Sequence, residues 1–324
     1  MSDPPSPGRR KFLLGTLLLP GLAACSSSSE PAATTGAAGT TGSTATARGT
    51  GSTGAHPSVS TTSPGAAGVL NVVAHQDDDL LFLSPALLIS LHSGIPVRTV
   101  FLTAGDDGRA APYWREREAG IRAAYAQMMG VPDNWRSAPS GLPDRTALTL
   151  AAAPQVGLVF LRLPDGGPGR GFPRYRDQSL PRLWRGEQSR IMAVDGKASY
   201  SRVTLIDTIS RLMTFSNPKI VRTQDFHGRF GDGDHNDHHA TAYLTRAASL
   251  RYATAHQLES YEDYATSSRR TNVPARLLKA KVAAFASYAA HDSQVCASGT
   301  STCAISFRSW ELRQYRLSTS RQPL

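Results

Sequence analysis

The feature that most constrains this chain is a short apolar run that ends in one imidazole and three carboxylates. Residues 69–74 (Val-Leu-Asn-Val-Val-Ala) are typical of a buried β-strand, and His75, Gln76 and three aspartates, Asp77 to Asp79, follow directly. Adjacent carboxylates repel one another, so nothing in the stability of a fold favours three of them at a strand end. A bound cation would offset that repulsion. The sequence therefore predicts a metal site at the end of this strand.

A second cluster of metal-binding residue types lies far downstream. Residues 235–239 read His-Asn-Asp-His-His and follow a loop rich in Gly and Asp, residues 225–234. Either cluster alone has a structural explanation, because an acidic run is often a solvated turn and a His-rich helix start is often a cap region. Both clusters, however, follow predicted strands, at 69–74 and 219–223, and the carboxyl ends of parallel strands lie at one edge of a sheet. We expect the two clusters to meet around one metal ion.

The order of the predicted elements indicates an α/β fold. Apolar or β-branched runs predict strands, and longer runs with helical periodicity predict helices between them. The predicted strands are 69–74, 97–103, 156–163 and 219–223, and the predicted helices are 80–92, 113–130, 201–215, 237–253 and 273–290. Residues 307–315 fit a closing strand or a short helix, and 132–154 read as a loop. Alternating strands and helices predict a mostly parallel sheet with helices on both faces.

The residue types in the two clusters favour zinc or another transition metal. A catalytic zinc site commonly has three His or carboxylate ligands and a water, and His75, Asp78 and His238 supply such a set. Two imidazoles argue against calcium and magnesium, which prefer oxygen ligands. Asp77 could accept a proton from the water. His235 lies about one helical turn before His238, so both can face the same side.

The same residues resemble the motifs of a known enzyme family. Residues 74–79 are similar to the A-H-P-D-D-E motif of the PIG-L (LmbE-like) deacetylases, and residues 235–238 are similar to their H-x-D-H motif. Shorter matches occur in the family's order at 103–105, 115–118, 129–131 and 163–166. The resemblance covers about residues 68–255. It implies a zinc-dependent hydrolase with a Rossmann-like fold that removes an N-acetyl group from an N-acetylglucosamine-type sugar or glycoconjugate.

The resemblance also implies a role for each matching residue. It implies one zinc ion bound by His75, Asp78 and His238, with Asp77 as the general base. It further implies that His235 stabilises the developing oxyanion or helps the amine to leave, and that Asp237 orients His235. Arg115 would contact the substrate.

Two positions depart from the family pattern. Gln76 replaces a proline, which removes no ligand, and Asp79 replaces a glutamate, which leaves the role of that acid open. These departures motivate an alternative, a catalytically silent glycan-binding lipoprotein on the same fold. Because every predicted ligand and the base are present, we expect the enzyme.

The start of the chain predicts export. Residues 9–11 (Arg-Arg-Lys) precede the apolar stretch 12–24, which is shorter than the roughly 20 residues that span a bilayer. This order resembles a twin-arginine (Tat) signal peptide over residues 1–25, and a frayed basic N-terminus is the alternative. Leu-Ala-Ala-Cys at 22–25 resembles a bacterial lipobox that would make Cys25 the lipid-modified residue; a chance cysteine beside an ordinary cleavage site is the alternative.

The next segment predicts a tether to a single folded domain. Residues 26–66 are mostly Ser, Thr, Gly, Ala and Pro and predict a disordered linker. Residues 67–324 then form the deacetylase domain with a C-terminal extension. We expect an extracytoplasmic protein, lipid-anchored to the outer face of the bacterial cell membrane or secreted, whose partner is an N-acetylated sugar or cell-envelope glycan.

Charge and cysteine content give weaker indications. The net charge is +10, and the part after residue 66 carries +8 of it, which suits anionic envelope polymers but is equally typical of an ordinary arginine-rich protein. We expect no nucleic-acid partner, because the sequence has no stretch in which aromatic and basic residues alternate.

The three cysteines allow one disulfide. If Cys25 carries lipid, Cys296 and Cys303 remain, and export favours a disulfide between them. Two free thiols or a metal pair are the weaker alternatives.

Overall fold

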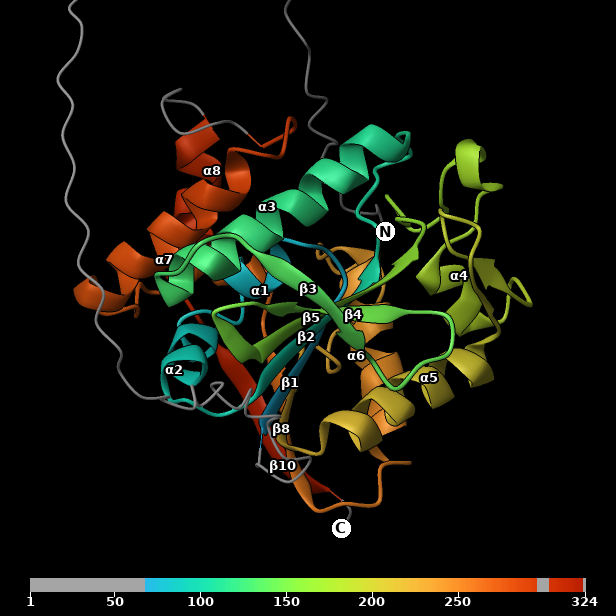
Figure 1. Ribbon diagram of the computed structural model, residues 1–324. Coiled ribbons are helices and arrows are strands. Elements are labelled where there is room, and N and C mark those ends of the chain that lie inside the picture. Colours follow the sequence, from blue (N-terminus) through green and yellow to red (C-terminus); the bar gives the residue numbers. More distant parts are fainter. Residues whose placement is uncertain (1–67, 296–302, 323–324) are drawn as a thin grey trace, which may run out of the picture. The chain divides into compact units, whose positions relative to one another are not determined.

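Eight strands form one mixed sheet in the computed structural model, which describes residues 68–295 and 303–322 (Figure 1). Five central strands run parallel in the order β9-β8-β1-β2-β5. They are β1 (Gly68–Val73), β2 (Val97–Thr103), β5 (Ala153–Leu163), β8 (Pro218–Thr223) and β9 (His256–Tyr261). The antiparallel strands are β10 (Arg316–Gln322) beside β9, and β4 (Thr146–Leu150) and β3 (Trp135–Pro139) beyond β5. The predicted α/β fold with a mostly parallel sheet is confirmed.

Helices cover both faces of this sheet, as the sequence predicts (Figure 1). One face carries α1 (Asp78–Leu81), α2 (Ala86–His92), α3 (Ala111–Met129) and α7 (Ala275–Ala289), with α8 (Cys303–Glu311) packed on α1 and α7. The other face carries α4 (Leu180–Arg185), α5 (Arg202–Ser216) and α6 (Asn236–Ser249). The short elements are the 3-10 helices η1 (Pro173–Tyr175) and η2 (Tyr264–Ser268), and the paired strands β6 (Ile191–Met192) and β7 (Ser199–Tyr200).

Strand β1 is buried on both faces, which explains its uninterrupted apolar sequence. Val69 and Val73 point into the core that contains α1, α2, α3 and α7, whereas Leu70 and Val72 point into the core that contains α4, α5 and α6. None of the four is more than 2% exposed. Such two-sided burial is typical of a central parallel strand and fixes the place where the acidic loop begins.

Two parts of the chain differ from the sequence-based prediction. The helix predicted at 80–92 divides into α1 and α2, because Pro85 lacks an N–H donor and disfavours helical geometry in the residue before it. The loop predicted at 132–154 contains the β3–β4 hairpin. β3 lies at the sheet edge with its side chains at least partly exposed, so its sequence carries no apolar run.

The C-terminal third adds elements that the sequence did not indicate. Strands β9 and β10 were not predicted, because their polar side chains interrupt the apolar pattern. Residues 303–311 form α8, so the predicted short helix is present at the start of the run 307–315.

Three predictions concern parts of the chain that the structure does not describe. Residues 1–25, residues 26–66 and Cys296 lie outside the described residues. The signal peptide, the lipid anchor and the disulfide therefore stay predictions.

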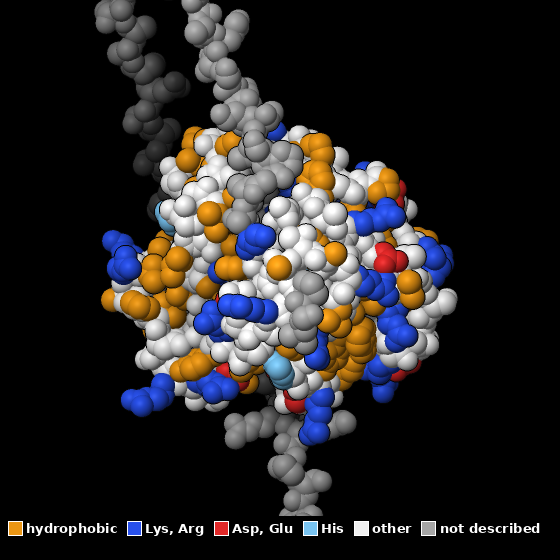
Figure 2. All heavy atoms as spheres, turned by 90° about the horizontal axis from the view of Figure 1, so that it is seen from below, with side chains coloured by type: hydrophobic (Ala, Val, Ile, Leu, Met, Phe, Trp, Pro, Cys, Tyr) orange, Lys and Arg blue, Asp and Glu red, His pale blue; other side chains and the backbone are white. Residues whose placement is uncertain are grey.

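On the face drawn in Figure 2, Lys and Arg side chains are dispersed and form no single continuous patch. Among the residues that the structure describes, none of the helices is both long and apolar enough to cross a membrane.

Candidate active site

Each of the five parallel strands is followed by a buried polar residue at one edge of the sheet. These residues are Asp78 after β1, Asp106 after β2, Asp165 after β5, Gln224 after β8 and Asp263 after β9. They are linked by hydrogen bonds: the amide of Asp165 donates to Asp106 (2.8 Å), and Nε2 of Gln224 donates to Asp78 (3.1 Å) and Asp263 (3.3 Å). The predicted convergence of the strand-end loops is therefore present.

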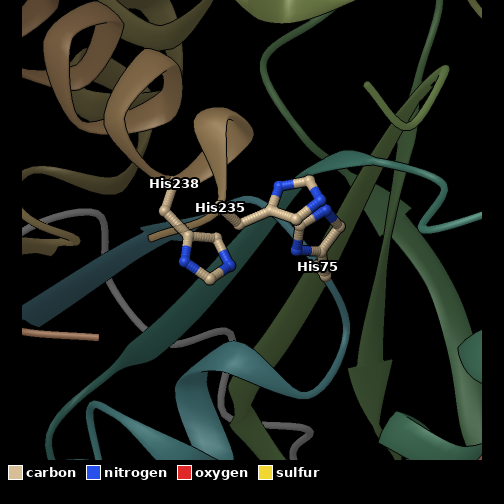
Figure 3. A group of neighbouring side chains, drawn as sticks. All are labelled: His75, His235 and His238. Atoms are coloured by element: carbon tan, nitrogen blue, oxygen red, sulfur yellow. The ribbon is translucent and has the colours of Figure 1, made fainter. Parts of the chain in front are cut away.

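Three histidines from the two sequence clusters meet at this edge (Figure 3). His75 comes from the loop after β1, while His235 and His238 come from the start of α6. One ring nitrogen from each lies within 4.8 Å of the others. The ring centroid of His75 is 4.7 Å from that of His235 and 5.2 Å from that of His238. The two stretches thus form one cluster that could hold a metal ion.

The Asp78 carboxylate lies between two of these rings. Its Oδ1 is 3.1 Å from Nε2 of His238, and its Oδ2 is 3.3 Å from Nδ1 of His75. Oδ2 also accepts a hydrogen bond from the backbone amide of His75 (2.6 Å). Burial alone would raise the pKa of Asp78, but the two imidazoles outweigh it and hold that pKa well below its ordinary value. The three residues predicted as metal ligands therefore lie together.

His238 has the arrangement of a metal ligand. Its Nδ1 is 2.9 Å from a carboxylate oxygen of Asp234, which favours the proton on Nδ1 and leaves the lone pair on Nε2. Nε2 is buried and lies 3.1 Å from Oδ1 of Asp78, without the geometry of a hydrogen bond to any residue in 68–295 or 303–322. A buried polar atom without a well-formed hydrogen bond is costly, and a cation bound between Nε2 and the Asp78 carboxylate would satisfy both.

The charge balance of the cluster also favours a cation. Burial alone would lower the pKa of His75, but Asp78 and Asp165 outweigh it and raise that pKa to about 10. Burial likewise opposes the charged form of His238, yet Asp78, Asp234 and Asp263 raise its pKa well above the ordinary value. In the absence of a metal, the surplus of carboxylates thus holds protons on both imidazoles. A metal ion would displace these protons and supply the positive charge instead. The donor set fits such an ion.

His235 is held in a different protonation state from His75 and His238. Its Nδ1 accepts a hydrogen bond from the backbone amide of Asp237 (3.2 Å), so the neutral ring carries its proton on Nε2. Burial and the charges of His75 and His238 lower the pKa of His235, which favours that neutral form. The Asp237 carboxylate accepts from the amide of Gly166 (2.7 Å) and lies 3.8 Å from His235 Nδ1. Asp237 therefore orients His235 mainly through its backbone. The result is an Nε2–H donor beside the ligand cluster.

Asp77 is paired with an arginine that had no assigned role. Nη2 of Arg117 donates to Oδ1 of Asp77 (2.6 Å), and Nη1 donates to the carbonyl of Gly105 (2.8 Å). Burial raises the pKa of Asp77, and Arg117 partly offsets that shift. Gly105 has φ +56°, and a Cβ there would lie 2.2 Å from Nη1, so this close approach requires glycine. Asp77 is thereby fixed beside the residues that could bind a metal ion.

Arg115, which was expected to contact the substrate, lies elsewhere. Its exposed side chain rests over the ring of Trp114 (5.1 Å) and does not line the pocket beside His75. Residues two apart on a helix point to different sides, so only Arg117 of this pair reaches the cluster. Both are in the segment 115–118, and the sequence pattern alone does not separate them.

The two positions that depart from the family motif have structural roles. Nε2 of Gln76 donates to the carbonyl of Thr103 (3.2 Å), which ties the acidic loop to the end of β2. Asp79 is buried and accepts a hydrogen bond from the hydroxyl of Tyr125 (2.5 Å). Burial raises the pKa of Asp79 to about 8 despite that hydrogen bond. Asp79 therefore joins α1 to α3, and it is not among the residues that line the pocket beside His75.

A pocket of about 220 Å³ opens over the cluster. One side is polar, with His75, Asp77, Asp78, Arg117, Asp165 and His235. The other side is apolar or aromatic, with Leu81, Phe82, Tyr264, Phe307 and Trp310. The sequence analysis missed Tyr264, Phe307 and Trp310, because they belong to η2 and α8 in the C-terminal extension. The aromatic residues at 307 and 310 are a sequence signal that could have indicated Phe307 and Trp310, and no such signal marks Tyr264.

Comparison with known proteins identifies the family. The family model described as PIG-L, GlcNAc-PI de-N-acetylase, matches residues 70–249, more than half of the chain. The chain belongs to the PIG-L family. This confirms the resemblance found in the sequence. Membership supports a hydrolytic deacetylase of GlcNAc-type substrates, and the His/Asp cluster could bind a metal ion.

Several solved structures are similar to this chain at low identity. The A40926 pseudoaglycone deacetylase Dbv21 is 16% identical, with 74% of this chain and 87% of that chain covered and a TM-score of 0.44. The N,N'-diacetylchitobiose deacetylase from Pyrococcus horikoshii is 16% identical, with 82% and 88% covered and a TM-score of 0.46. The hydratase GalB from Pseudomonas putida is 14% identical, with 75% and 82% covered and a TM-score of 0.41. Among curated proteins, none matches this chain.

Proposed function

We propose that this PIG-L family member is a zinc-dependent N-deacetylase of an N-acetylglucosamine-type sugar or glycoconjugate, exported to the cell envelope. The observation that carries the proposal is the convergence of His75, Asp78 and buried His238 at the base of the pocket that Asp77 lines. Two imidazoles and one carboxylate are a ligand set that zinc accepts, with a position left open for water. When bound, zinc would polarise the substrate carbonyl and lower the pKa of a water.

The chain's own residues then divide the proton transfers. Asp77 uses Oδ1 for Arg117, and its Oδ2 receives no hydrogen bond from the described residues, so Oδ2 can accept the proton of the attacking water. The buried position makes Asp77 a stronger base than an exposed aspartate, because burial raises its pKa. His235 presents its Nε2–H toward the pocket, where it can donate to the oxygen that becomes negative. Asp77 would then pass the proton to the nitrogen as the C–N bond breaks, so that acetate and a free amine leave.

Export and anchoring rest on the N-terminal sequence alone. The twin-arginine run at 9–11 and the lipobox-like residues 22–25 support a protein held to the outer face of the membrane through lipidated Cys25. We expect the full chain to partition with membranes when expressed in a bacterium. A Cys25→Ser variant should appear in the soluble fraction; equal membrane retention of both forms would contradict the anchor.

The function is tested by acetate release across a panel of N-acetylated compounds. The panel contains free N-acetylglucosamine, N-acetylglucosamine oligomers and lipid-linked N-acetylglucosamine, each incubated with zinc-loaded protein. We expect acetate and a primary amine in equal amounts from at least one compound. Specific glycan binding without release from any compound would instead favour the glycan-binding alternative.

A further inference from the structure

Tyr264 is an aromatic residue of the pocket whose hydroxyl has no assigned partner. It begins η2, directly after β9 and Asp263, and so belongs to the fifth parallel strand end of the site. Its hydroxyl forms no hydrogen bond with any residue in 68–295 or 303–322, although its ring lines the pocket beside Asp77 and Asp78. A phenol in a largely buried place usually finds a partner. A substrate atom in the pocket could be that partner.

The Tyr264 ring lies next to the proposed ligand His238. Its ring lies edge-on to His238, with centroids 5.1 Å apart, while His235 lies 5.3 Å from His238. One N–H donor from His235 and one O–H donor from Tyr264 therefore lie close to the predicted ligand His238.

The C-terminal extension holds Tyr264 in this place. The ring of Trp310 stacks on that of Tyr264 at 5.0 Å and 20°, and its Nε1 donates to the Tyr264 carbonyl (3.1 Å). Trp310 is in turn fixed by Lys281 of α7, a buried ammonium that donates to the carbonyls of Trp310 (3.1 Å), Arg313 (2.9 Å) and Leu81 (2.6 Å). Leu81 ends α1, the helix that begins with the ligand Asp78. Lys281 thus joins Trp310, which packs on Tyr264, to α1, which carries the proposed ligand Asp78.

We infer that Tyr264 is a substrate-contacting residue whose hydroxyl donates a hydrogen bond to the carbonyl oxygen of the scissile acyl group. The inference rests on the proposed function for the identity of the acyl group. It assigns a role to residues beyond 70–249, the part that the family model covers. Stacking on Trp310 leaves the Tyr264 ring little freedom, so the donor is preorganised for the oxygen on which negative charge develops.

The test compares Tyr264→Phe with wild type and with Tyr315→Phe. Phenylalanine keeps the ring that packs on Trp310 and removes only the hydroxyl. Tyr315 is the matched control, because its hydroxyl donates to the Arg270 carbonyl (2.6 Å), and Tyr315 is not among the residues that line the pocket. The probes are acetate binding to the zinc-loaded protein by calorimetry, zinc content, and kcat and KM for the best compound of the acetate-release panel.

We expect Tyr264→Phe to weaken acetate binding about tenfold, the effect of one hydrogen bond to a charged group. We expect kcat to fall about 100-fold with KM and zinc content unchanged, and Tyr315→Phe to match wild type. A kcat and acetate affinity unaffected by Tyr264→Phe would overturn the inference while leaving the deacetylase intact. Tyr264-dependent acetate binding without sugar deacetylation would support the inference and contradict the proposed substrate. A wild-type protein that holds zinc but neither binds acetate nor deacetylates would overturn both.

Discussion

Asp77→Asn is expected to lower kcat by about 10²- to 10⁴-fold, the range that a positioned general base contributes. The amide keeps the size of the side chain but cannot accept a proton from the attacking water. Arg117 retains its contacts with Gly105 and Tyr288, and the three proposed ligands are unchanged, so the fold and the proposed metal site should persist. Because the loss acts on the chemical step, KM should change little. Steady-state acetate release together with zinc content measures both parts of this expectation.

The matched control for this variant is Asp207→Asn. Asp207 is a partly exposed residue of α5 that pairs with Arg251, and it is not among the residues that line the pocket over His75. We expect wild-type kinetics from it. If Asp77→Asn kept full activity while holding zinc, another residue would have to be the base, and the assigned proton transfer would be wrong.

Arg117→Met is expected to have the largest effect on stability. Arg117 is buried and lies between two acids, 2.6 Å from Asp77 and 3.1 Å from Asp292, and its Nε also donates to the Tyr288 hydroxyl (2.6 Å). Its removal leaves two carboxylates without their cation in a largely buried site, which typically costs about 3–5 kcal/mol. Asp77 would also lose the partner that fixes it, so activity should fall. Urea unfolding and acetate release measure the two effects.

Arg115→Met is the control, because it removes the same charge from the same helix at an exposed position. A surface change of this kind usually alters the free energy of unfolding by about 0.5 kcal/mol or less. We expect unchanged kinetics as well, since Arg115 does not line the pocket. The reverse pattern, in which Arg115→Met raises KM and Arg117→Met does not affect activity, would restore the substrate contact inferred from the motif.

The parts of the site that the sequence predicted are the parts encoded within short segments. His75, Asp77 and Asp78 are neighbours in the chain, and a buried strand end brings them to the sheet edge whatever the rest of the fold does. His235 and His238 are separated by about one turn at the start of a predicted helix, so the sequence also predicts that both face the same side. The parallel sheet then brings the two segments together.

The missed parts depend on tertiary packing. Arg117 and Arg115 are equivalent in a local pattern, and only the approach of α3 to Gly105 distinguishes them. Tyr264 and Asp263 follow β9, whose polar residues interrupt the apolar pattern, so no strand and no strand end were predicted there. Trp310 reaches the pocket because Lys281 joins α7, α8 and the end of α1, a contact across long stretches of sequence.

The most direct test of the whole account is the metal content of the purified protein, wild type beside His75→Ala/His238→Ala, with acetate release followed in parallel. His92→Ala/His291→Ala is the control, because both of these histidines are exposed and neither lines the pocket. We expect one zinc ion per chain in wild type and control, and loss of both zinc and acetate release in the His75/His238 variant. A wild-type protein that holds no metal under zinc-replete conditions, or a double variant that keeps its zinc, would contradict the proposed metal site.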